Sequence, residues 1–137
     1  RDNDTVFIHS DSTKTIPGSR FYIHGSDVAD AIHFLLNLNE DQLKLAYEPD
    51  FGAAKCPKFN VVGKEEINNL QLAKYIADCQ GKELKYEMID FHSSRPGHDL
   101  RYALDGGLLK ELGWELKYSF EEGIRKTIEW YKKRVSV

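Results

Sequence analysis

Hydrophobic positions in the N-terminal part of the chain change from an alternating pattern to a helical one. Two short runs, over residues 6–8 and 21–23, carry apolar residues at every second position, and a polar stretch with a Pro-Gly pair separates them. This pattern predicts two extended segments joined by a loop. Apolar residues then recur at helical spacing, which predicts a helix over 27–37 with Ser26 or Asp27 as its N-cap.

The middle of the chain is less regular. Residues 38–57 contain acidic residues, two prolines and a glycine but no sustained period. We therefore expect a surface loop there, with one helical turn around 42–46. Order returns after this loop, and a short strand is predicted over 58–62.

Start and stop signals for helices are clear in the rest of the chain. A helix is predicted to begin at Asn68 or Asn69 and to end at Gly81, and a strand is expected over 84–89. Two more helices are predicted, one capped by Asp105 and stopped by Gly113, the other opened by a capping box formed by Ser119-Phe120-Glu121-Glu122. The fold class expected is a small mixed α/β domain with about four helices and several short strands.

Length and charge limit the classes of partner. With 137 residues, the chain has the size of one domain, which we expect to span 1–137. Its 19 Lys and Arg residues against 22 Asp and Glu give a formal net charge of −3. A nucleic-acid polymer is therefore an unlikely partner, because phosphate binding usually needs a basic excess. No apolar run is long enough to cross a bilayer, so no membrane partner is expected either.

Cysteine usage and the chain start suggest where the protein works. Cys56 and Cys79 are too few for a disulfide framework, so a reducing compartment and a cytoplasmic location are expected. The chain begins at Arg1 without a signal-peptide pattern, and its single methionine is Met88. We therefore expect a piece of a longer protein. The histidines have no ligand spacing with cysteines or acids, so no metal site is expected.

The tetrapeptide Arg95-Pro96-Gly97-His98 is the most informative short motif. Pro followed by Gly suits the central positions of a type II turn, which brings the flanking Arg95 and His98 close together. A guanidinium and an imidazole side by side could bind a diphosphate. From the residues alone, a plain surface turn is the commoner interpretation.

Two other polar residues have an open role. Arg20 precedes the segment that leads into the first helix, where a buried salt bridge to Asp27 or Asp30 and ligand binding are equally compatible with its position. Asn60 comes just before a Gly63 turn, where its amide can either tie the loop or contact a ligand.

These motifs together resemble the C-terminal part of the nucleotide-sugar 4,6-dehydratases of the extended short-chain dehydrogenase/reductases, the dTDP-glucose 4,6-dehydratase type. Residues 95–105, which read Arg-Pro-Gly-His-Asp-Leu-Arg-Tyr-Ala-Leu-Asp, and the Leu-Gly-Trp at 112–114 resemble two signatures of that family. Residues 123–131 resemble its terminal helix, and Phe59-Asn60-Val61-Val62-Gly63 resembles its Tyr-Asn-Ile-Gly strand. The similarity covers almost the whole chain from Arg20 onward.

The resemblance implies a site and a reaction. In that family, the residues matching Arg20, Asn60, Arg95 and His98 surround the nucleotide diphosphate of the substrate, which favours ligand binding over a plain turn. The chain is then the substrate-binding lobe of an NAD-dependent lyase acting on a nucleotide-diphosphate sugar. Departures such as Leu100 in place of an arginine keep relatives acting on UDP- or GDP-sugars, including 4-epimerases, as alternatives.

The chemistry of the family lies on an N-terminal Rossmann lobe that the chain does not encode. No Gly-rich phosphate turn and no Tyr-x-x-x-Lys pair occur in the sequence. We therefore expect no catalytic residue and no bound cofactor in this chain, which would be inactive alone. NAD would be bound by the absent Rossmann lobe, which is an expected partner, and the full-length form could be a homodimer. The rival hypothesis is a stand-alone, non-catalytic binding module.

Overall fold

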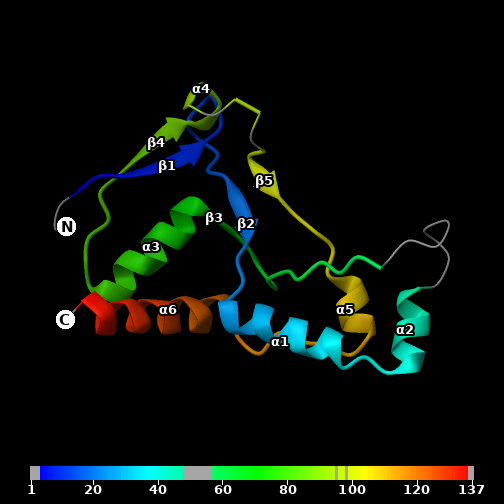
Figure 1. Ribbon diagram of the computed structural model, residues 1–137. Coiled ribbons are helices and arrows are strands. Elements are labelled where there is room, and N and C mark those ends of the chain that lie inside the picture. The colour runs from blue at the N-terminus through cyan, green and yellow to red at the C-terminus, as the bar shows by residue number, and fades with distance from the viewer. Residues whose placement is uncertain (1–3, 48–56, 95, 98, 136–137) are drawn as a thin grey trace.

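The computed structural model describes residues 4–47, 57–94, 96–97 and 99–135, and it confirms the predicted mixed α/β class. Figure 1 shows three longer helices below two small groups of strands. The elements follow in the order β1 (Val6–Ser10), β2 (Ser19–Phe21), α1 (Gly25–Leu36), α2 (Glu40–Ala46), β3 (Glu66–Asn68), α3 (Asn69–Gln80), β4 (Tyr86–Asp90), α4 (Phe91–Ser94), β5 (Arg101–Tyr102), α5 (Gly107–Glu111) and α6 (Phe120–Val135).

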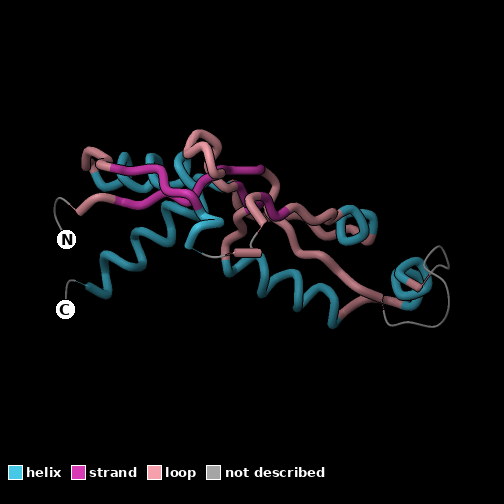
Figure 2. Tube along the Cα trace, turned by 90° about the horizontal axis from the view of Figure 1, so that it is seen from above, coloured by secondary structure: helices cyan, strands magenta, loops and turns pink. Residues whose placement is uncertain are grey.

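The strands form two small sheets. β1 pairs with β4 in parallel, from Val6 opposite Tyr86 to Ser10 opposite Asp90. β2 is the central strand of the second sheet, with β3 antiparallel on one side and β5 parallel on the other. The view from above shows strands of the two groups close together near the middle of the molecule, with α2 at the far end (Figure 2).

Several predicted helix boundaries are confirmed. The side chain of Asn68 caps α3 and forms a reciprocal capping box with Gln71, and Gly81 ends the helix with φ +65°. Glycine adopts that left-handed conformation more readily than other residues do. The Oγ of Ser119 and the carboxylate of Glu122 form the predicted box at the start of α6. None of the helices in the described ranges combines the length and apolar character needed to cross a membrane.

The predicted cap of α1 is wrong. His24 is the N-cap, and its Nδ1 accepts a hydrogen bond from the backbone N–H of Ser26 at 3.2 Å. Asp27 instead turns into the interior, where Oδ1 accepts from the backbone N–H of Lys117 at 3.0 Å. A tertiary contact thus removes this carboxylate from the capping role that its position suggests.

The expected strand over 58–62 is also wrong, because that segment pairs with no strand in the described part of the chain. A strand needs the backbone of a neighbour along its length. This segment instead packs the side chains of Phe59 and Val61 against the core. It ends at Gly63, where an added Cβ would lie 2.0 Å from the carbonyl oxygen of Tyr22.

Two short helices differ from the expectation for their regions. The single turn expected around 42–46 is a longer helix, α2, because Asn39 and Gln42 form a capping box at its start. α4 follows β4 directly and was not predicted.

The core lies between α1, α5 and the loop before α6. Ala31, Leu109 and Trp114 are buried together, and partly buried apolar side chains from α1, from 58–62 and from Ile23 pack around them. The indole Nε1 of Trp114 donates to Asp30 at 3.1 Å, so the ring is both packed and oriented. This core fixes the position of α5, and with it the end of the segment that carries β5.

Candidate functional site

The guanidinium of Arg20 is held against the start of β5. Nη1 donates to the carbonyl oxygens of Ser19 at 2.6 Å and Leu100 at 3.1 Å, and Nη2 donates to that of Asp99 at 3.4 Å. No carboxylate of a described residue forms an ion pair with Arg20. The carbonyl groups therefore orient the positive charge without neutralising it, and it can still attract an anion.

Tyr102 covers one face of this guanidinium. Arg20 and Tyr102 are register partners on β2 and β5, and the Cζ of Arg20 lies 4.2 Å from the centroid of the tyrosine ring. Such cation–π stacking restricts the orientation of the guanidinium plane. The tyrosine is 45% exposed, so the pair lies at the surface of the sheet.

A second polar cluster lies on the opposite face of the same sheet. Arg101 binds Glu66 with two hydrogen bonds, Nε to Oε1 at 2.6 Å and Nη2 to Oε2 at 2.8 Å. The hydroxyl of Ser19 donates to the same Oε1 at 2.6 Å. The hydrogen bonds from Arg101 and, to a smaller extent, from Ser19 lower the pKa of Glu66 to about 2. Glu66 in turn raises the pKa of Arg101. The charge of Arg101 is therefore compensated, unlike that of Arg20.

Asn60 lies at the C-terminal end of the segment 99–105 that contains β5, whereas Arg20 binds near the start of this segment. Its Nδ2 donates to the backbone carbonyl of Asp105 at 2.8 Å, and the residue is exposed. The amide thus holds a loop in place, which is one of the two roles that the sequence left open for Asn60. Arg20 and Asn60 hold the same segment, residues 99–105, near its start and at its end.

Arg95 and His98 lie outside the described residues. Between them, Pro96 and Gly97 form a turn, and Gly97 has φ +87°. That value is typical of the third residue of a type II turn, where glycine is favoured. The turn predicted from the sequence is therefore confirmed at its two central positions.

The predicted salt bridge between Arg20 and Asp27 or Asp30 is not formed. Asp30 forms an ion pair with Lys117. The hydrogen bond from Lys117, and then the one from Trp114, lower the pKa of Asp30. Asp27 accepts a hydrogen bond from a backbone N–H. Both carboxylates belong to the packing of α1 against the loop before α6. The structure therefore contradicts the salt-bridge interpretation of Arg20, and ligand binding stays a prediction.

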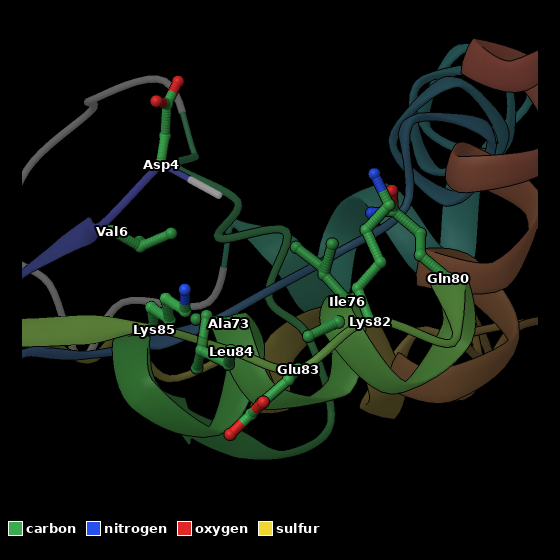
Figure 3. A pocket seen from close by; sticks show the side chains of 10 residues that line it. Asp4, Val6, Ala73, Ile76, Gln80, Lys82, Glu83, Leu84 and Lys85 are labelled. Carbon is green, nitrogen blue, oxygen red and sulfur yellow. The ribbon is translucent and has the colours of Figure 1, made fainter. Parts of the chain in front are cut away.

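No metal site is formed by the described residues, since no three His, Cys, Asp or Glu side chains are placed to share an ion. A cavity of about 540 Å³ lies away from Arg20, between the start of β1, α3 and residues 82–85. Figure 3 shows Val6 and Ile76 on two sides of this cavity, which charged residues such as Glu83 also line. Arg20 and Asn60, the predicted site residues that the structure describes, do not line this cavity.

Sequence reasoning missed the roles of Tyr102, Glu66 and Arg101. The signal that could have found Tyr102 and Arg101 is their alternation on β5, which puts neighbouring side chains on opposite faces. Glu66 carries no such local signal, because its contact with Arg101 depends on two strands being placed on either side of β2.

Comparison with known proteins shows what this chain is similar to. No family model matches the chain. It is 32% identical to the dTDP-glucose 4,6-dehydratase of Escherichia coli in an alignment of length 115, which covers 77% of this chain and 30% of that protein. The chain therefore spans about a third of the length of this relative.

Solved structures give the same fold. The dTDP-glucose 4,6-dehydratase of Bacillus anthracis in complex with NAD matches 97% of this chain with a TM-score of 0.67 and 24% identity, over 36% of its own length. The UDP-glucose-4-epimerase of Stenotrophomonas maltophila, with bound NAD and formylated UDP-arabinopyranose, matches 96% of this chain with a TM-score of 0.72 and 22% identity, again over 36% of its length. By sequence and fold, the chain is similar to about a third of a dTDP-glucose 4,6-dehydratase, and it shares this fold with a UDP-glucose-4-epimerase.

Proposed function

We propose that this chain is the nucleotide-sugar-binding lobe of an NAD-dependent dTDP-glucose 4,6-dehydratase, a lyase. Arg20, Asn60, Arg95 and His98 would surround the nucleotide diphosphate. The observation that carries the proposal is the guanidinium of Arg20, which is fixed by carbonyl groups and Tyr102 and has no carboxylate partner among the described residues. A fixed, uncompensated guanidinium at the protein surface is suited to forked contacts with phosphate oxygens.

The proposed roles differ between the four residues. Arg20 would contribute charge and also hold the Asp99–Leu100 backbone, while Asn60 would hold the end of the same segment through Asp105. Arg95 and His98 would supply further donors from either side of the Pro96-Gly97 turn. The diphosphate would thus be bound by one segment and by the two side chains that position it.

The described residues do not fit NAD. No connection between a strand and a helix in the described ranges has the three-glycine spacing that admits a pyrophosphate at a helix N-terminus. β2 is joined to α1 by Tyr22-Ile23-His24, and the connection from β5 to α5 carries only the pair Gly106-Gly107. We therefore assign hydride transfer to a separate Rossmann lobe and no catalytic step to this chain. Its own part is to bind and orient the substrate.

A second candidate is a lobe of a UDP- or GDP-sugar dehydratase or 4-epimerase. The fold match to the Stenotrophomonas epimerase, which was solved with a UDP-sugar, supports this second candidate. The two candidates share diphosphate contacts and differ in the base, the sugar and the product. Incubation of the protein, with its natural flanking sequence, with dTDP-glucose and UDP-glucose distinguishes a 4-keto-6-deoxy product from a 4-epimer.

Nucleotide titration tests the binding role. In the protein expressed with its flanking sequence, we expect Arg20→Ala and Arg95→Ala each to weaken dTDP binding by about 1–3 kcal/mol, as for a charge-assisted contact. In turnover, both should raise KM more than they lower kcat, because diphosphate contacts are equal in the ground and transition states.

Lys74→Ala is the control, since it removes a positive charge from the exposed side of α3. Unchanged affinity in both arginine variants would contradict the assignment. Turnover or NAD binding by the 137 residues alone would contradict the absence of chemistry in this chain.

A further inference from the structure

β5 is a very short strand at the edge of its sheet. It consists of Arg101 and Tyr102, which pair with Ser19 and Arg20 of β2. The backbone N–H of Ser19 adds one hydrogen bond to the carbonyl of Leu100 at 3.0 Å. Because the backbone hydrogen bonds to β2 are so few, they hold β5 only weakly. Side-chain contacts must therefore help to keep β5 on the sheet.

Those side chains act from both faces. On one face, Arg20 binds the carbonyls of Asp99 and Leu100 and stacks on Tyr102. On the other, Glu66 of β3 reaches across the central strand to Arg101 and also accepts from Ser19. We call the second group, Ser19, Glu66 and Arg101, the carboxylate bridge. It joins all three strands of the sheet through one carboxylate.

The carboxylate bridge has the geometry that makes an exposed ion pair effective. Isolated surface ion pairs contribute little, but a forked arginine–carboxylate contact within a network is the recognised exception. The Glu66 side chain is 32% exposed and that of Arg101 is 59% exposed, so solvent reaches both partners and the two-bond geometry must supply the stability of the pair. With a pKa of about 2, Glu66 stays ionised at neutral pH.

On the basis of the function proposed above, we infer that Glu66 is a positioning residue for nucleotide-diphosphate binding. Through Arg101 it holds β5 on β2, so that the Arg20 guanidinium keeps its carbonyl partners and its orientation toward the ligand. Glu66 does not touch the ligand, because it lies on the opposite face of the sheet from Arg20.

This role and simple electrostatics make opposite predictions. Removing a negative charge near an anion site, and releasing the guanidinium of Arg101, would strengthen nucleotide binding if charge alone mattered. If Glu66 acts by positioning, its loss weakens nucleotide binding instead. The sign of the change in affinity therefore separates the two.

The test compares Glu66→Gln with Glu65→Gln in the protein expressed with its natural flanking sequence. Glu65 is the exposed neighbour of Glu66, so the control removes the same charge without breaking the carboxylate bridge. Affinity for dTDP and UDP is measured by titration, and hydrogen exchange of the peptide covering 99–102 reports on β5 directly. We expect Glu66→Gln to weaken binding by about three- to tenfold and to speed exchange, whereas Glu65→Gln leaves exchange unchanged and binding equal or tighter.

A second variant guards against a general folding defect. Arg101→Gln breaks the same bridge from β5, and the double variant with Glu66→Gln should be no weaker in binding than the worse single variant. Unchanged or tighter nucleotide binding by Glu66→Gln would overturn the positioning role. Absence of nucleotide binding by the unmodified protein would overturn the proposed function and this role with it, and the exchange data would still report whether Glu66 holds β5.

Discussion

Two exposed carboxylates make hydrogen bonds that bear on how the protein responds to acid. The pKa of Asp11 is lowered to about 2 by the hydroxyl of Thr13 and by the backbone N–H of Ile16, and the pKa of Glu66 is lowered to about 2 by Arg101 and Ser19. A carboxylate with a lowered folded-state pKa stabilises the protein above its unfolded pKa. That contribution is lost as pH falls towards the folded value.

For Glu66 the sensitive window runs from the ordinary pKa of 4.5 down to about 2. We expect the unfolding free energy of the unmodified protein to fall across this window, and that of Glu66→Gln to fall less, because the variant has no carboxylate to protonate there. Denaturant unfolding at a series of pH values measures the difference. Glu65→Gln should follow the unmodified protein, and parallel curves for all three proteins would contradict the expectation.

At the scale of single elements, the backbone conformation of one residue can decide where a helix ends. α3 ends at Gly81, whose φ of +65° suits glycine, while α1 begins at Gly25, which has no positive φ. A Cβ added at either position meets no atom within 4 Å. The two glycines therefore differ in backbone conformation and not in the space around them.

This pair gives a matched test of backbone strain. Gly81→Ala should lower the unfolding free energy by about 1 kcal/mol, because alanine is strained in the left-handed region. Gly25→Ala should leave it unchanged or raise it slightly, since alanine restricts the unfolded chain and fits the first turn of a helix. Equal effects in thermal or denaturant unfolding would show that φ is not the deciding factor.

The whole molecule exposes several large apolar side chains. Leu36 is 80% exposed, Leu104 63% and Phe7 59%, and others from α1, α2 and α6 are at least 40% exposed. Single exposed apolar residues are normal, but a contiguous surface larger than a few hundred Å² usually contacts another structure. In the proposed function, the Rossmann lobe would cover some of these exposed side chains.

Expressed alone, the 137 residues should therefore self-associate or bind a hydrophobic dye. Adding the natural flanking sequence should reduce both, because the added lobe covers the apolar surface. Sedimentation at increasing concentration, together with dye fluorescence, measures the effect. A strictly monomeric chain without dye binding would favour the stand-alone binding module.

The sequence by itself determined the features that depend on a few neighbouring residues. The capping boxes at Asn68 and Ser119, the helix end at Gly81 and the turn at Pro96-Gly97 follow from side-chain and backbone preferences that act over one turn of chain. The motifs also pointed to the dTDP-glucose 4,6-dehydratases, one of which is 32% identical to this chain.

Only the tertiary structure decided which distant residues meet. Asp27 looked like a helix cap but binds the backbone of Lys117, and the apolar segment 58–62 looked like a strand but has no strand beside it in the described chain. Glu66 reaches Arg101 only because β2 lies between β3 and β5. Strand pairing and burial depend on contacts between segments far apart in sequence, so local patterns do not contain this information.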